Sequence, residues 1–371
     1  MPLAAWGDLV LVGLSHREAG VEVRERLAFQ ASELETAISE LCGDGILSGL
    51  VVVSTCNRLE CYAGARDAAA AQQRLREFLV RRAPQCEEFL FSLSGAAALR
   101  HLFRVASGLD SIVVGEHQIL SQVKESYQQS VAARGTDKIL NKAFQAAFAA
   151  GKAVRARTGI AQGITSCGAA AVALAEKILS RDGAKTRRIL LLGAGKTAQT
   201  AAQHLLCGPA ATLTIANRDL AHARELAGSF NARAVSLEEG MASIHDMDVL
   251  IASTACPHYI VTRSRMAELT RQRGGAPLVL IDLGVPRNID PTVAGIPGVH
   301  LYNIDDLETI IADSLSKRRG EIAAAESISA ECALKLLRAL KSEQAPGEGC
   351  RIVPTGVILR HAAAIGEENA S

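Results

Sequence analysis

The sequence lacks the patterns that would indicate a disulfide framework or a structural metal. Its 371 residues include nine cysteines, an odd number, with neither a Cys-x-x-Cys pair nor a His-Glu-x-x-His motif. We therefore predict that no metal is bound and that most of the cysteines are small core residues.

Excess charge and long apolar runs are also missing. A net charge of +1 creates no global field for nucleic acid, so an RNA partner would need a local patch. The most apolar stretch, residues 189–216, is interrupted by Lys196, glycines and a proline, which indicates soluble core. The first residues, MPLAAWGDLVLVG, have no signal-peptide shape. We expect a cytoplasmic protein that binds no membrane.

What is present indicates a folded chain of several domains. Residues 1–158 alternate short strands and amphipathic helices and then run into longer helices, which predicts an N-terminal α/β or α+β domain. Residues 159–303 alternate apolar strands with helices, as in a doubly wound parallel sheet of Rossmann type. Within 304–371, helical spacing from Asp306 to Leu340 predicts one helix of about 35 residues, followed by a shortened helical region.

A glycine-rich array in the second unit predicts dinucleotide binding. In ILLLGAGKTAQTAA, a predicted strand and helix flank the pattern G-x-G-x-x-A. Its glycines allow a tight turn and a close approach of pyrophosphate to the backbone. A phosphate-loop interpretation fails, because Leu190 stands where that motif needs its first glycine. The residues expected to bind the cofactor here are Gly193, Ala194, Gly195, Lys196, Thr197 and Ala198.

The residues after the next strand indicate which dinucleotide is bound. An NAD site would place an acid there for the ribose hydroxyls, yet the first polar residues are Asn217 and Arg218. A guanidinium suits a 2′-phosphate, which favours NADPH. Asp219 follows directly and could instead bind the ribose, so NAD stays an alternative.

Cys56 follows the apolar run VVVST and has two interpretations. Free cysteine is among the most buried residue types, so Cys56 could be strand core, as we predict for Cys61. However, Thr55, Asn57 and Arg58 form a polar turn around it, and Arg58 could stabilise a thiolate and a substrate carboxylate. Together with a nicotinamide site, such a thiol suggests reduction of an acyl group through a thioester.

Taken together, these segments resemble the glutamyl-tRNA reductase family, the NADPH enzymes that begin the five-carbon route to 5-aminolevulinate and tetrapyrroles (porphyrins). The matching blocks are GLSHREAGVEVRE, STCNRLE, RHLFRVASGLDSIVVGEHQILSQVK, GAGKTAQ, ANR, DLGVPRNID, LYNIDDL and VPT, in this order. The resemblance implies that Cys56 attacks the ester of glutamyl-tRNA, and that hydride from NADPH converts the thioester to glutamate 1-semialdehyde.

The resemblance also implies the remaining site residues and partners. His101 would assist in proton transfer or orient the ester; otherwise it would be a helix-surface or core-capping histidine. Arg58 would pair a glutamate carboxylate, and an anionic Glu116 would suit the α-ammonium. A homodimer joined through the long helix, and hand-over of the aldehyde to an aminomutase, are further expectations. The substrate-binding residues implied are Thr55, Cys56, Asn57, Arg58, Ser111, Glu116, His117, Gln118 and Gln122.

Four positions depart from the family pattern. Glu18 replaces a usual threonine or serine, and it would repel the substrate unless it faces away or pairs with Arg17. Gly20 and His117 replace usual prolines, which removes a restraint on φ. Lys196 replaces a common glutamate and either opposes the helix dipole or contacts a cofactor phosphate. The short tail predicts a smaller dimer contact.

Two other functions are compatible with the sequence. A shikimate-type dehydrogenase also places a small α/β domain before a dinucleotide sheet, and it needs no cysteine nucleophile. A relative that binds tRNA or a partner protein without turnover would also tolerate the departures above.

Overall fold

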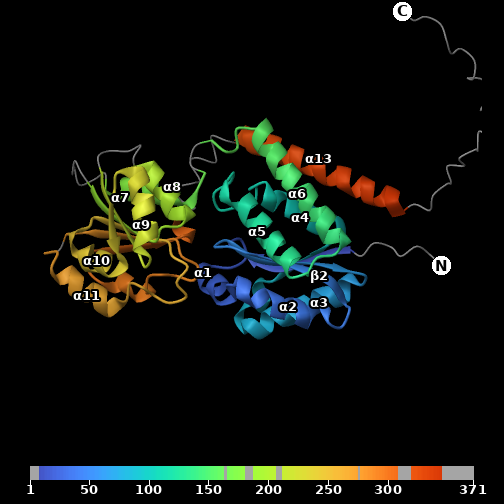
Figure 1. Cartoon of the computed structure of the whole chain (residues 1–371), viewed down its shortest axis with the longest axis horizontal. Coiled ribbons are helices and arrows are strands. Elements are labelled where there is room, and N and C mark those ends of the chain that lie inside the picture. The colour runs from blue at the N-terminus through green and yellow to red at the C-terminus, as the bar shows by residue number, and fades with distance from the viewer. Residues whose placement is uncertain are drawn as a thin grey trace, which may run out of the picture.

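The structure is a computed structural model that describes residues 8–162, 165–179, 187–205, 211–274, 276–307 and 319–344. These residues form two bodies, each built on its own sheet, and a last helix that lies along the first body (Figure 1). Short 3-10 turns join several elements: Glu25–Leu27, Ala31–Glu33, Pro84–Phe89, Ser243–Asp246, Pro291–Gly295 and Asp305–Leu307.

The first body contains a four-stranded sheet in the order β2-β3-β1-β4, and all its pairings are antiparallel. The unit is therefore α+β, one of the two possibilities that the sequence left open. Its strands are β1 (Asp8–Ser15), β2 (Leu47–Ser54), β3 (Arg58–Ala65) and β4 (Phe91–Ser94).

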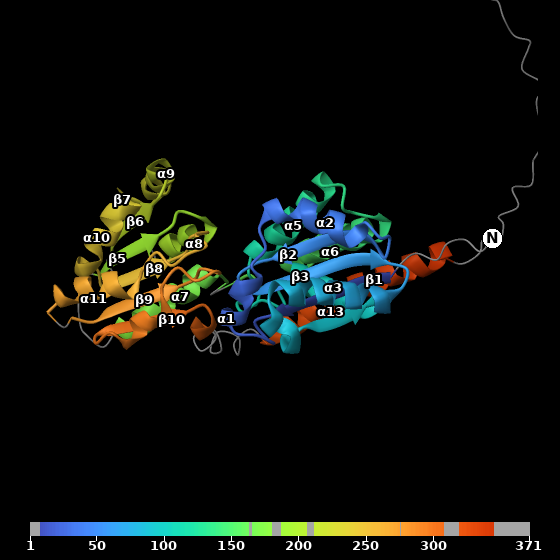
Figure 2. The same ribbon diagram turned by 90° about the horizontal axis from the view of Figure 1, so that it is seen from below.

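Helices cover both faces of this sheet because successive side chains of a strand point to opposite sides (Figure 2). Val10, Val52 and Cys61 pack on one face with α2 (Leu34–Cys42) and α3 (Ala68–Arg82). The other face packs against the remaining helices of the body: α4 (Gly95–Ala106), α5 (Gln118–Ala132) and α6 (Lys138–Arg157). The short α1 (Val21–Arg24) lies toward the second body.

The second body is a six-stranded parallel sheet in the order β10-β9-β8-β5-β6-β7. Counted from β7, this is the 3-2-1-4-5-6 order of a doubly wound dinucleotide-binding sheet, so the predicted fold class is confirmed. The strands are β5 (Arg187–Leu192), β6 (Ala211–Asn217), β7 (Arg233–Ser236), β8 (Val249–Ala252), β9 (Leu278–Asp282) and β10 (Val299–Asn303). The helices are α7 (Cys167–Leu179), α8 (Lys196–Leu205), α9 (Leu220–Phe230), α10 (Leu237–Ala242) and α11 (Arg263–Arg271).

The last described helix, α13 (Arg319–Gln344), is 26 residues long and packs on α4 and α6 through Ala325, Ile328 and Ala333. Its apolar stripe is thus largely covered within the chain. The predicted helix began at Asp306, which instead lies in a 3-10 turn; residues 308–318 and the tail after 344 lie outside the described residues. No helix in the described ranges is both long and apolar enough to cross a membrane.

Candidate active site

Cys56 lies in the tight turn between β2 and β3. The amide of Thr55 donates to the Arg58 carbonyl oxygen at 2.9 Å, and the amide of Asn57 donates to Thr55 Oγ1 at 3.2 Å. The thiol is half-buried, with Sγ 3.5 Å from Asn57 Oδ1. Cys61, by contrast, is wholly buried in β3, and burial raises its pKa to about 12. The polar-turn interpretation therefore fits Cys56 and the core interpretation fits Cys61.

Behind this turn lies a buried cluster of charges around Arg58, which is 1% exposed. Arg58 Nη1 is 2.6 Å from Glu60 Oε1 and 3.0 Å from Asp110 Oδ2. Glu60 also accepts a hydrogen bond from Tyr62 Oη at 2.6 Å and lies 2.8 Å from His101 Nε2. His101 therefore reaches the Cys56 turn through Glu60 and Arg58.

The charges in this cluster stabilise one another. Burial alone would raise the pKa of Glu60, but Arg58 and His101 outweigh it and hold the pKa at about 2. Burial would likewise lower the pKa of Arg58, and the two carboxylates outweigh it and raise the pKa. Pairing of Arg58 with a substrate carboxylate stays a prediction. The substrate would have to compete with Glu60 and Asp110, whose carboxylates already neutralise the guanidinium.

The same cluster includes the one group of metal-type ligands found within the described residues, namely Glu60, His101 and Asp110. Their ligand atoms lie within 4.8 Å of one another. Arg58 Nη1 bonds to both carboxylates, so a guanidinium already supplies the cation that these side chains share.

Glu116 and Ser111 are buried in the segment between α4 and α5. Burial raises the pKa of Glu116 to about 7, so near neutral pH a large fraction of its carboxyl groups carries a proton. The role of an anionic Glu116 as partner of the α-ammonium stays a prediction. Ser111 is 3% exposed, and its Oγ has no hydrogen-bond partner among the described residues, which leaves it able to bond a ligand.

Three further predicted residues, His117, Gln118 and Gln122, lie at the start of α5, in different surroundings. Gln118 Nε2 is 3.4 Å from Thr200 Oγ1 on α8, so it spans the two bodies. Gln122 lines a separate cavity of about 230 Å³ with Ser54, which lies two residues before Cys56. His117 is exposed and precedes α5.

The departures from the family pattern are accommodated locally. His117 has φ −71° and Gly20 has φ −65°, so both keep the backbone angle of the proline they replace. Glu18 accepts hydrogen bonds from Ser15 N at 2.9 Å and Ser15 Oγ at 2.7 Å. Of the two alternatives for Glu18, pairing with Arg17 is not the one observed, because Arg17 Nε contacts Asp110 Oδ1 at 3.0 Å.

A crevice opens at the carboxyl ends of β5, β6 and β8, where the strand order reverses. Gly193 has φ +108°, and a Cβ there would lie 2.2 Å from the Ser253 carbonyl oxygen. A Cβ at Gly195 would meet no atom within 4 Å, so the turn leaves open space beside its backbone. Gly193, Ala194, Gly195 and Asn217 line a cavity of about 560 Å³, which fits the predicted phosphate-binding turn.

An adjoining cavity of about 380 Å³ is lined by Asn217, Arg218 and Asp219, the residues predicted to discriminate between dinucleotides. Arg218 lines it together with Asn217, which lines both cavities. The Asp219 Oδ1 accepts a hydrogen bond at 2.9 Å from the amide of Ala221 and caps α9. Because capping engages Asp219, the geometry favours NADPH over NAD.

The first turn of α8 contains one buried residue and one exposed residue of the predicted cofactor site. Ala198 is 2% exposed and packs in the core, as the motif requires, whereas Lys196 is exposed at the first position of the helix. The Thr197 carbonyl accepts a hydrogen bond from Thr200 Oγ1 at 3.0 Å. Direct contact of Lys196 or Thr197 with a cofactor stays a prediction.

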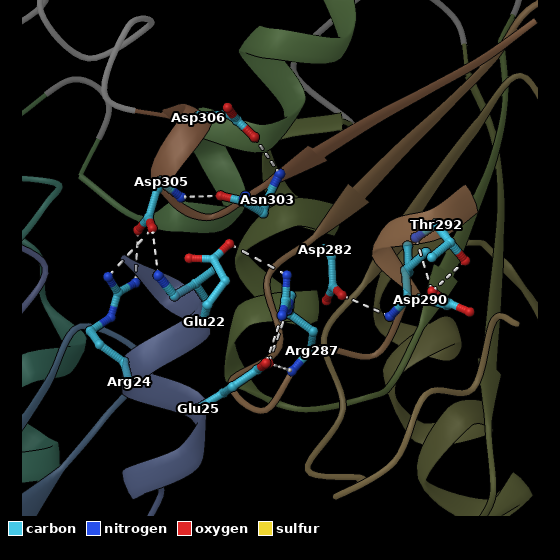
Figure 3. A network of polar contacts seen from close by, with 12 residues as sticks. Glu22, Arg24, Glu25, Asp282, Arg287, Asp290, Thr292, Asn303, Asp305 and Asp306 are labelled. Carbon is cyan, nitrogen blue, oxygen red and sulfur yellow. Dashed lines mark hydrogen bonds and ion pairs between the residues drawn. The ribbon is translucent and has the colours of Figure 1, made fainter. Parts of the chain in front are cut away.

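Ion pairs hold the two bodies side by side (Figure 3). Arg24 Nη2 lies 2.7 Å from Asp305 Oδ1, and Arg287 Nη2 lies 2.6 Å from Glu25 Oε1. Arg24 Nε also donates to the Cys56 carbonyl oxygen at 3.2 Å. The Cys56 turn is thus tied to the interface, and Cys56 packs against the apolar cluster that contains α7 and α8.

Sequence reasoning missed three residues of this site, Glu60, Asp110 and Cys167. Glu60 could have been found, because Arg58, Glu60 and Tyr62 alternate along one strand and so share a face. Asp110 and Cys167 are distant in sequence, and no local pattern places them beside Cys56.

Comparisons with known proteins agree on one family. The family model "Glutamyl-tRNAGlu reductase, N-terminal domain" matches residues 12–158, and the model "Shikimate / quinate 5-dehydrogenase" matches residues 173–310. A glutamyl-tRNA reductase from Trichlorobacter lovleyi is 39% identical over 95% of this chain and 80% of its own length. One from Geobacter sulfurreducens is 40% identical over 87% and 75%. The solved glutamyl-tRNA reductase of Methanopyrus kandleri is 34% identical, with coverages of 90% and 81% and a TM-score of 0.48.

Proposed function

The chain belongs to the glutamyl-tRNA reductase family, and on this premise we propose that it reduces glutamyl-tRNA to glutamate 1-semialdehyde with NADPH, the first step of tetrapyrrole biosynthesis. The observation that carries the proposal is the position of Cys56. Its half-buried thiol sits in a polar turn and packs against the body that contains the dinucleotide crevice.

The residues of the turn support thiol chemistry. Cys56 attacks the ester carbonyl of the aminoacylated tRNA, which forms a glutamyl thioester and releases the tRNA. Ser111 has an unsatisfied hydroxyl for the bound glutamate, and Thr55 and Asn57 shape the turn. His101 is held by Glu60, so its ring is positioned before substrate arrives. Its role in proton transfer or ester orientation belongs to the proposal.

The crevice fits NADPH through its own residues. The Gly193–Gly195 turn leaves its backbone open to a pyrophosphate, and Arg218 supplies a guanidinium for a 2′-phosphate. NADPH, when bound, supplies the hydride that the thioester accepts. The guanidinium of Arg218 and the capping role of Asp219 both support this cofactor over NAD.

The domain roles and partners follow from the same proposal. We assign residues 1–158 to the catalytic, tRNA-binding domain, 159–303 to the NADPH domain, and 304–371 to the helix and dimerisation region. A homodimer joined through the last helix is part of the same proposal. Transfer of the unstable aldehyde to an aminomutase, in the cytoplasm, completes the expected setting.

Single-turnover reduction of glutamyl-tRNA tests the proposal. Wild-type protein with NADPH should release glutamate 1-semialdehyde, whereas Cys56→Ser should lose activity by at least about 10³-fold because the nucleophile is removed. Cys42→Ser is the matched control, since Cys42 is also half-buried but lies on α2.

Two outcomes would contradict the proposal. Full activity of Cys56→Ser on an oxidisable substrate would indicate a shikimate-type dehydrogenase. Wild-type protein that binds glutamyl-tRNA without forming a thioester would be a binding protein.

A further inference from the structure

A second cysteine lies beside the proposed nucleophile. Cys167, the first residue of α7, is 4% exposed, and the neighbouring Cys56 thiol is the main cause that raises the pKa of the Cys167 thiol. Cys167 Sγ also lies 3.9 Å from Glu116 Oε1. Cys56 packs against the apolar cluster to which Cys167 belongs. The two sulfurs and one carboxyl group are therefore contiguous, although they come from three distant segments.

We propose that Cys56 and Cys167 form a reversible disulfide when the protein meets a peroxide, with Cys167 as the resolving cysteine. Cys56 comes from the first body and packs against the cluster of the second body that contains Cys167. A disulfide needs its sulfurs about 2.05 Å apart, so the two side chains must move toward each other.

The chemistry balances with hydrogen peroxide as the oxidant. The Cys56 thiolate attacks one peroxide oxygen, the O–O bond breaks, and Cys56 becomes a sulfenic acid while the other oxygen leaves as hydroxide. The Cys167 sulfur then attacks the Cys56 sulfur, which forms the S–S bond and breaks the S–O bond. The leaving hydroxide takes a proton and departs as water. Both sulfurs are oxidised, and one peroxide is reduced to two waters.

Glu116 is placed to accept the proton that Cys167 must lose. The hydrogen bond with Cys56 and burial raise the pKa of the Cys167 thiol well above its usual value, so at rest it stays protonated. The pKa of Glu116, about 7, leaves a fraction of its carboxyl groups free as a base at neutral pH. A thiolate formed at Cys167 would also lie at the N-terminus of α7, where the helix dipole favours an anion.

The disulfide would have two consequences. It would occupy the Cys56 sulfur and so block its attack on an ester. The expected loss of reductase activity rests on the proposed function. It would also link the β2–β3 turn of the first body to α7, which packs on α8 of the second. Because Cys167 consumes the sulfenic acid before a second peroxide can react with it, the disulfide would protect Cys56 from irreversible oxidation to sulfinic acid, and reduction would restore the free thiol.

Thiol mapping of the full chain tests the inference. Reduced protein is treated with hydrogen peroxide, blocked with a maleimide, digested, and analysed by mass spectrometry, with reductase activity measured before and after dithiothreitol. Wild type should lose two reactive thiols, yield a linked Cys56–Cys167 peptide, and recover most of its activity on reduction. Cys167→Ser and Cys167→Ala should form no such link and should fail to recover, while Cys42→Ser should behave like wild type.

The mapping on wild type decides the inference even if the Cys167 variants fold poorly. Peroxide inactivation without the Cys56–Cys167 link, or equal recovery by a folded Cys167 variant, would overturn it. A linked peptide in a protein that, when reduced, fails to act on glutamyl-tRNA would support the disulfide and refute the proposed function.

Discussion

The two halves of the proposed active site are built in opposite ways. Around Cys56, charged side chains are buried and balance one another, as Arg58 does between Glu60 and Asp110. In the dinucleotide crevice, backbone and small residues define the shape, as at Gly193 and Gly195. A site of buried charges depends on every partner being present, whereas a site of backbone geometry depends on the absence of side chains.

Removal of Arg58 should cause the largest loss of stability. Arg58→Ala leaves two buried carboxylates without their cation, and the free energy of unfolding should fall by about 3–5 kcal/mol. The exposed Arg188, which pairs with Asp246 at 3.6 Å in the second body, is the control. Arg188→Ala should cost less than about 1 kcal/mol. Equal effects in a denaturant titration would show that the buried cluster is not a structural unit.

The pH dependence of stability should be the next largest effect. The pKa of Glu116 is about 7 in the folded chain against 4.5 for an ordinary glutamate. Between these values the folded state holds a proton that the unfolded state releases, so stability falls as pH rises, by about 3 kcal/mol for this group. Glu116→Gln should remove this contribution, so that in denaturation from pH 4.5 to 8 the stability of wild type relative to the variant should decline. The same change at the exposed Glu125 of α5 should give a difference from wild type that stays constant over this range.

Two glycines provide a matched pair in the crevice. Gly193→Ala places a Cβ 2.2 Å from the Ser253 carbonyl at φ +108°, so stability should fall by about 1–3 kcal/mol. Gly195→Ala meets no protein atom within 4 Å and should keep stability within about 1 kcal/mol of wild type. Its NADPH affinity should nevertheless fall about tenfold or more, because the methyl group occupies the pyrophosphate position. Unchanged binding by Gly195→Ala in a fluorescence titration would place the cofactor elsewhere.

Arg218 and Asp219 should give the smallest effects and separate binding from folding. Arg218→Ala should weaken NADPH binding about tenfold through loss of the 2′-phosphate contact and should change NADH binding little. Asp219→Ala should cost about 1 kcal/mol of stability because α9 loses its cap. A selective loss of NADH binding in Asp219→Ala would instead support NAD as the cofactor.

The contrast also explains which parts of the site could be predicted. The G-x-G-x-x-A array lies within one strand-turn-helix unit, so its local pattern was sufficient to predict the turn and the crevice. The Cys56 turn was equally local. Asp110 and Cys167 approach the turn only through the packing of distant segments, and Glu116 acquires its raised pKa only through burial.

Strand and helix periodicity, the glycine spacing and the order of the motifs were enough to predict the doubly wound second domain, the dinucleotide turn and the polar turn around Cys56, because each depends on neighbours along the chain. They left open whether the first domain is α/β or α+β. Tertiary structure alone decided that Arg58 is neutralised by two carboxylates, that burial raises the pKa of Glu116 to about 7, and that Cys56 packs against the cluster that contains a second thiol, Cys167. These properties arise from desolvation and from charges brought together across long sequence separations, and such effects exist only after the chain has packed.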